Sequence, residues 1–255
     1  MNKRIFITLS VAFAAFACLA TRASAAVAPC AIGGNKFDKL KTIANDPALD
    51  SGTKIREALA LRKELLTQTL DCAISDAQAL QTNLSGVSIP DPDIARIQTR
   101  ILGRISEAIS YYQTQEASVN DLGLQGSHDF AANLKTWRAG NYTPLIEAAQ
   151  NLILWSHNQD LIQTAQNRMN QISHTMVLLS IVNDKDVQTP WQNAEANFND
   201  AQNFNQQATD SLKAIDDPDT SLDLIKSSLG ALSKVYQNFL DLSDALSNVL
   251  PTTPQ

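Results

Sequence analysis

Residues 190–215 read PWQNAEANFNDAQNFNQQATDSLKAI, and side chains of one kind recur there at intervals of three and four. All but one of these positions are apolar: Trp191, Ala194, Phe198, Ala201, Asn205, Ala208, Leu212 and Ile215. Such intervals place side chains on one face of an α-helix. Thr189, Pro190 and Gln192 match a capping box with proline at the first helical position, which predicts that this helix begins near residue 190.

The same spacing resumes after Asp216-Asp217-Pro218-Asp219. Its members are Leu222, Ile225, Leu229, Leu232, Tyr236, Phe239, Ser243, Leu246 and Leu250. Two amphipathic helices of similar length joined by so short a loop are expected to pack antiparallel, face against face. The pattern therefore predicts a helical hairpin over about 190–250.

A second hairpin is predicted over about 53–120. Its helices are connected through Asp91-Pro92-Asp93, which repeats the tripeptide Asp217-Pro218-Asp219. An acidic turn that binds a metal is one interpretation. Aspartate at the N-cap followed by proline is also the usual start of a helix, and we favour this second interpretation.

Between the hairpins, Pro144 begins a segment that has no further proline or glycine until about Asn183. This segment predicts one long helix over about 144–183. A shorter helix is expected around 129–137, and Gln159 interrupts the apolar spacing, where a kink is an alternative. No segment alternates with a period of two. The predicted fold is all-α: an elongated bundle of two antiparallel helical hairpins around one long central helix. We expect a single domain over 26–250, with two loosely joined hairpin modules as the alternative.

Composition excludes several classes of protein. The chain has 255 residues, 44% of them hydrophobic, and only nine glycines and nine prolines, which is unlike a disordered, collagen-like or small disulfide-rich protein. The formal net charge is −6, and no stretch gathers lysine and arginine as a nucleic-acid partner would require.

The first 25 residues have the layout of a secretory signal peptide. Lys3 and Arg4 precede an apolar run over 5–20, and a short polar stretch ends in Ala23-Ser24-Ala25. Cleavage before Ala26 would remove three basic residues and no acid, lowering the net charge from −6 by three units to −9. We expect a secreted or periplasmic protein. No later segment is long enough to span a membrane, and residues 251–255 are expected to form a flexible tail.

The expected mature chain keeps two cysteines, Cys30 and Cys72. Export to an oxidising compartment favours a disulfide between them, which would stabilise the fold by about 4 kcal/mol on the chain-entropy model. The alternative is two unpaired buried thiols. Neither has a neighbouring cysteine or histidine at the spacing of a zinc site.

We predict no catalytic, cofactor-binding or metal-binding residue and expect no enzyme. The histidines lack ligand spacing, and neither a nucleophile elbow nor a glycine-rich phosphate loop is present. Trp155 and His157 are candidates to line a groove, although a buried tryptophan and a surface histidine are the alternative. Asn205 is a candidate determinant of helix register or oligomeric state, the alternative being a polar residue at the wet edge of the stripe.

Two functions follow as hypotheses. The first is an exported helical bundle with a structural or protein-interaction role in the cell envelope or outside the cell, with protein partners there or with copies of itself. The alternative is an extracytoplasmic bundle that binds or senses a small molecule between its helices. A cavity near Trp155 and His157 would favour the alternative.

Overall fold

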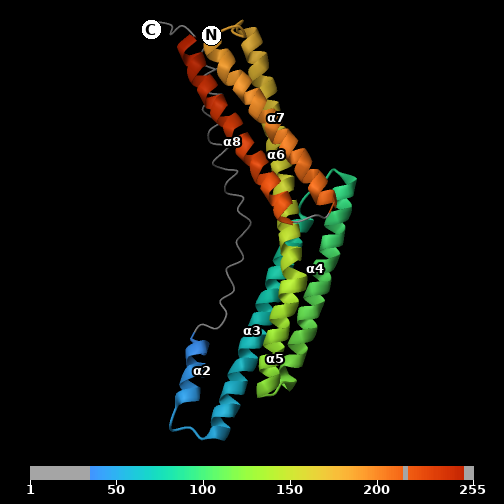
Figure 1. The fold of residues 1–255 in the computed structure, drawn as a ribbon, viewed down its shortest axis with the longest axis vertical. Coiled ribbons are helices and arrows are strands. Elements are labelled where there is room, and N and C mark those ends of the chain that lie inside the picture. Colours follow the sequence, from blue (N-terminus) through green and yellow to red (C-terminus); the bar gives the residue numbers. More distant parts are fainter. Residues whose placement is uncertain (1–34, 215–217, 250–255) are drawn as a thin grey trace, which may run out of the picture. The chain divides into compact units, whose positions relative to one another are not determined.

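The computed structural model describes residues 35–214 and 218–249, and these contain α-helices and no β-strand, so the predicted all-α class is confirmed. The α-helices are α2 (Lys36–Asn45), α3 (Ser51–Ser85), α4 (Pro92–Ser118), α5 (Leu124–Trp137), α6 (Thr143–Leu178), α7 (Lys185–Ala214) and α8 (Pro218–Val249) (Figure 1). A 3-10 turn, Val119–Asp121, follows α4, and a π-helix, Arg138–Tyr142, joins α5 to α6.

The described residues group into two compact units. The first contains residues 35–79 and 109–133, and the second contains 80–108, 134–214 and 218–249. These boundaries run through α3, α4 and α5 and not between the two predicted hairpins. The expectation of one domain over 26–250 stays a prediction.

In the first unit, basic side chains on α3 reach backbone carbonyls beyond α4. Lys63 Nζ donates to the carbonyl of Asn120 at 2.6 Å, and Arg62 donates to that of Leu124 at 3.4 Å. Lys36 on α2 forms an ion pair with Glu64 on α3 at 2.6 Å. The apolar faces of α2 and α3 contribute buried Ile43, Leu65 and Leu70 to this unit.

Aspartate caps the starts of α3 and α4. The backbone N–H of Thr53 donates to Asp50 Oδ1 at 2.9 Å, and the N–H of Ile94 donates to Asp91 Oδ1 at 3.2 Å. Pro92 occupies the first position of α4, where its missing N–H costs nothing. The predicted capping role of Asp91 is confirmed.

The predicted start of the helix at residue 190 is wrong, because α7 begins at Lys185 and contains Pro190 in its interior. Asp184 is the cap, accepting from the N–H of Asp186 at 2.9 Å, while the Thr189 hydroxyl donates back to the carbonyl of Lys185. The earlier start buries Val187, which packs against Met176 and Leu242. This burial offsets the single helical hydrogen bond that Pro190 lacks.

The long helix ends five residues before the predicted residue 183. Ser180 adopts a left-handed backbone with φ 56°, and the N–H groups of Ser180 and Ile181 donate to the carbonyls of Val177 and Met176, both at 3.1 Å. This pattern is a Schellman motif, in which a residue two beyond the end packs on the last turn. Ile181 packs against the cluster that contains Met176, and α6 thereby ends without glycine or proline. Helix α6 passes Gln159 without interruption.

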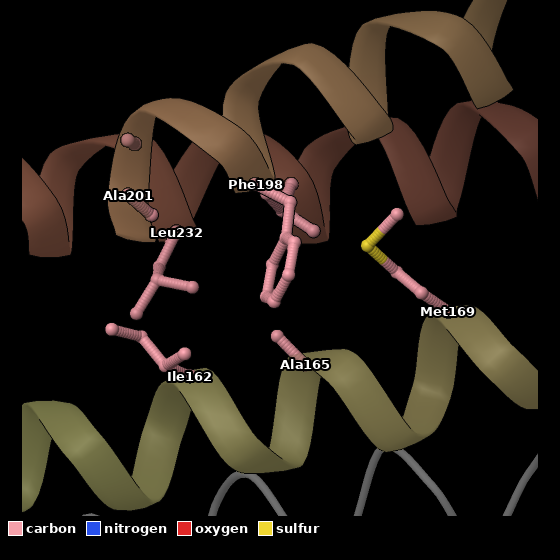
Figure 2. Close-up of a cluster of buried hydrophobic side chains, with 8 residues drawn as sticks. Ile162, Ala165, Met169, Phe198, Ala201 and Leu232 are labelled. Atoms are coloured by element: carbon pink, nitrogen blue, oxygen red, sulfur yellow. The ribbon is translucent and has the colours of Figure 1, made fainter. Parts of the chain in front are cut away.

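Helices α6, α7 and α8 pack side by side in the second unit, with α7 antiparallel to both neighbours (Figure 1). Close to their middle, Ile162, Ala165 and Met169 of α6 face Phe198 and Ala201 of α7 and Leu232 of α8 (Figure 2). The hairpin of α7 and α8 agrees with the prediction.

The buried face of α8 is rotated from the predicted one. Leu222, Leu229 and Tyr236 are only half-buried. The buried positions are Ser221, Ile225, Ser228, Ala231, Leu232, Val235 and Leu242. Ser221 and Ser228 can occupy buried positions of this face because their hydroxyls form hydrogen bonds with residues of α7.

Candidate functional site

A group of hydrogen-bonded polar side chains, all buried except the half-buried Ser211, lies in one part of the interface among α6, α7 and α8. We call it the polar segment: Asn151, Trp155, Asn158, Asn205, Thr209, Ser211, Ser221 and Ser228. At its centre, Asn158 is 0% exposed. Its Nδ2 donates to Asn205 Oδ1 at 3.0 Å and to Ser228 Oγ at 2.9 Å, so one amide joins all three helices.

One further bond continues this network, and two separate pairs lie nearer the start of α8. Ser228 Oγ donates to the carbonyl of Ala201 at 2.7 Å, and Asn151 Nδ2 donates to the carbonyl of Pro218 at 2.7 Å. The hydroxyls of Ser211 and Ser221 lie 2.8 Å apart. Asn158 Oδ1 accepts no hydrogen bond from the residues that the structure describes.

Asn205 is buried within the chain and bonded to Asn158, so its amide already has a partner on a neighbouring helix of the same molecule. This contact supports its predicted role in helix register and removes the basis for a role in oligomeric state. Asn158 was not among the residues predicted from the sequence. Its position, three residues after Trp155 and four before Ile162, is the same signal that identified Asn205.

The structure does not bring Trp155 and His157 together in a groove. Trp155 is 2% exposed, and its Nε1 donates to Thr209 Oγ1 at 2.9 Å, whereas His157 is exposed. Neighbours two apart on a helix do not share a face. The hypothesis of a Trp155 and His157 groove is therefore wrong.

Cys72 is buried in α3, and Cys30 lies outside the described residues. The disulfide between them stays a prediction. The expected signal peptide, the cleavage before Ala26 and the tail over 251–255 also lie outside the described residues.

An ion pair joins the start of α4 to the end of α7. Lys213 Nζ lies 2.8 Å from Asp91 Oδ2 and 3.8 Å from Asp93 Oδ2. The hydrogen bond from Lys213 lowers the pKa of Asp91, and the same bond raises the pKa of Lys213. Asp91 therefore both caps α4 and links it to α7.

Two open surface hollows among the described residues have linings of mixed polar and apolar character. One, of about 350 Å³, is lined from α7 and α8 by residues that include Asp186, Asn193 and Asp241. The other lies at the end of α2, next to Pro47. Within the described part of the chain, no three His, Cys, Asp or Glu side chains gather as a metal site would require.

The end of α6 and the turn that follows it expose four large apolar side chains. We call them the apolar tip: Val177 (60% exposed), Leu178 (70%), Leu179 (44%) and Val182 (41%). Their neighbours Met176 and Ile181 point the other way, packing with Val187 and Leu242. The motif that ends α6 thus divides one apolar run into a packed half and an exposed half.

Over residues 35–214 and 218–249, no helix has the length and apolarity needed to cross a bilayer. Two features of the second unit remain as candidates for function. One is the internal polar segment, whose hydrogen bonds are made within the chain, and the other is the apolar tip, which has no partner in the described structure. No protein-family model, curated protein or solved structure matches this chain.

Proposed function

We propose that the protein is an exported, non-catalytic binding protein that docks to another component of the cell envelope or the cell exterior through its apolar tip. The observation that carries this proposal is the exposure of Val177, Leu178, Leu179 and Val182 where α6 ends and the chain turns into α7. A contiguous exposed apolar patch is costly in water and marks interaction sites. The expected signal peptide supports the location.

The interior of α6, α7 and α8 favours this function over a small-molecule receptor. The indole N–H of Trp155 donates a hydrogen bond to Thr209, and the amide N–H groups of Asn158 donate to Asn205 and Ser228. A receptor needs polar groups that converge on a ligand cavity. Here those donors are used to join the helices.

Photo-crosslinking from the tip tests the proposal. A photoreactive aliphatic amino acid replaces Leu178 in the protein expressed in its native host, and the same residue replaces Leu154 as a matched control. Leu154 is also an exposed leucine of α6, about 36 Å along the helix from Leu178 at 1.5 Å per residue.

We expect adducts to protein or lipid from position 178 that are absent from position 154, because only the tip is in contact with a binding partner. Equal adduct patterns from the two positions, or none from position 178, would contradict the proposed function.

A further inference from the structure

We propose that the apolar tip inserts into the surface of a lipid bilayer, and that the bilayer it prefers is zwitterionic. This inference rests on the proposed function and names the partner of the same surface. Three observations carry it: the size of the tip, its place on an outward-facing turn, and the charge of the residues around it.

The tip is too small for a stable protein dimer. Four side chains of this size, 41 to 70% exposed, present on the order of 300 Å² of apolar surface. A stable protein interface buries roughly 800 Å² on each partner. A bilayer needs no complementary surface of that size, because the strength of binding at the boundary between headgroups and acyl chains scales with the apolar area that enters it.

The shape of the tip fits shallow insertion. Its residues lie at the end of α6 and in the turn that reverses the chain into α7, at the end of the three-helix bundle (Figure 1). The hollow lined by Asp186 and Asp241 contains none of the tip residues. The tip side chains therefore lie outside that hollow and are exposed at the end of the bundle.

The charge beside the tip determines the kind of lipid. Asp184 and Asp186 follow the tip directly, and Asp244 lies on α8 next to Ala245, which packs against Met176 and its neighbours. Lys185 is the one basic residue between the two aspartates. Anionic bilayers attract clusters of lysine and arginine, so they would repel this acidic surround, whereas a zwitterionic surface would not.

Vesicle flotation tests the inference. The protein is purified after export, with its N-terminus established by mass spectrometry, and mixed with phosphatidylcholine vesicles or with vesicles that also contain phosphatidylglycerol. The variants are V177S/L178S at the tip and L154S as the matched control, since both change exposed aliphatic side chains of α6. Circular dichroism verifies that all three proteins are equally helical.

We expect wild type and L154S to float with phosphatidylcholine vesicles, with a partition constant no greater than about 10⁴ M⁻¹, the value for a single myristoyl chain, because the tip exposes less hydrocarbon than such a chain. V177S/L178S should bind at least tenfold more weakly. Phosphatidylglycerol should weaken the binding of wild type at low salt, and high salt should restore it because it screens the repulsion.

Absence of wild-type flotation, equal flotation of V177S/L178S, or stronger binding to phosphatidylglycerol would each overturn the inference. Analytical sedimentation without lipid gives a further test. A dimer of the wild type that V177S/L178S abolishes would also overturn the inference, since a second copy would then cover the tip. If vesicles fail but position 178 crosslinks to a specific protein, the lipid inference fails while the proposed binding function stands. If both experiments fail, both proposals fail.

Discussion

Helices α6, α7 and α8 pack together over two adjacent segments of different chemistry. In the polar segment, Asn158 donates hydrogen bonds to Asn205 and Ser228, and each contact joins two helices. In the next segment, around Phe198, the facing side chains are apolar, as Figure 2 shows. Directional bonds therefore accompany apolar burial, such as that of Leu152 and Ile225, in the first segment, whereas the second is held by apolar burial.

The difference separates stability from register. Apolar burial is roughly proportional to area and tolerates small shifts between helices. A buried amide tolerates none, because moving it by one turn leaves donors and acceptors without partners at a cost of about 1–3 kcal/mol each. The comparison assigns stability within this interface mainly to the apolar segment and the choice of one helix alignment to the polar segment.

The largest expected effect is in the apolar segment. Phe198→Ala should lower the free energy of unfolding by about 3–5 kcal/mol, because it removes a buried aromatic ring and leaves a cavity among Ala165, Met169 and Leu232. Urea denaturation followed by circular dichroism measures the change. Phe37→Ala, at a side chain that is 53% exposed, is the control and should cost less than about 1 kcal/mol. Similar losses in the two variants would contradict the comparison.

The second prediction concerns the polar segment. Asn158→Ala should lower the free energy of unfolding by about 2 kcal/mol, since it leaves Asn205 Oδ1 without its donor in a buried site. The same denaturation experiment measures this loss.

Apolar replacement of the whole centre, Asn158→Leu with Asn205→Leu and Ser228→Ala, should restore stability to within about 1 kcal/mol of wild type. It should also produce more than one helix alignment, seen as several distances between spin labels on α6 and α8. A single unchanged distance in this triple variant would refute the assignment of register to the polar segment.

The smallest effect is expected at the ion pair of Asp91 and Lys213, at the outer end of the polar segment. Asp91→Asn keeps a capping side chain but removes the charge. Since the pKa of Asp91 is lowered from 3.8, its contribution is present above pH 3.8 and is lost as the pH falls through the lowered value. Since the pKa of Lys213 is raised from 10.5, the contribution of Lys213 to stability is present below pH 10.5 and is lost as the pH rises through that raised value.

Unfolding midpoints of wild type and Asp91→Asn should therefore differ near neutral pH and converge at both extremes. Asp223→Asn, which removes the exposed pair with Lys226 on one helix, is the matched control and should change the midpoint less. A difference between wild type and Asp91→Asn that is independent of pH would rule out the linkage.

The sequence alone indicated the helical class and most of the buried positions of α7. Ala194, Phe198, Ala201, Asn205, Ala208 and Leu212 were identified by spacing, and all are buried. This prediction succeeds because the period of the helix is a local property that any amphipathic segment expresses in its own residues. The start of α4 was predictable for the same reason, since Asp91 caps it from the adjacent residue.

The errors have a common cause in tertiary packing. The end of α6 and the start of α7 differ from their predicted positions because Ile181 packs against the cluster of Met176 and because Val187 is buried between α6 and α8. No local signal at Ser180 or Pro190 reveals these contacts. The centre of the α8 stripe moved to Ser228, since an interface that contains Asn158 favours a hydroxyl over a leucine. These outcomes depend on which residue of another helix lies opposite.

Sequence periodicity by itself thus determined that this chain is helical, where α4 begins and which face of α7 is buried, because each depends on residues within a turn or two of one another. Tertiary structure decided that Asn158 pairs with Asn205 and Ser228 and that the buried Trp155 donates to Thr209. It also decided that the residues of the apolar tip are exposed while Met176 is buried. Those features depend on the alignment of three helices, which is set by the sum of contacts among them and not by any single segment.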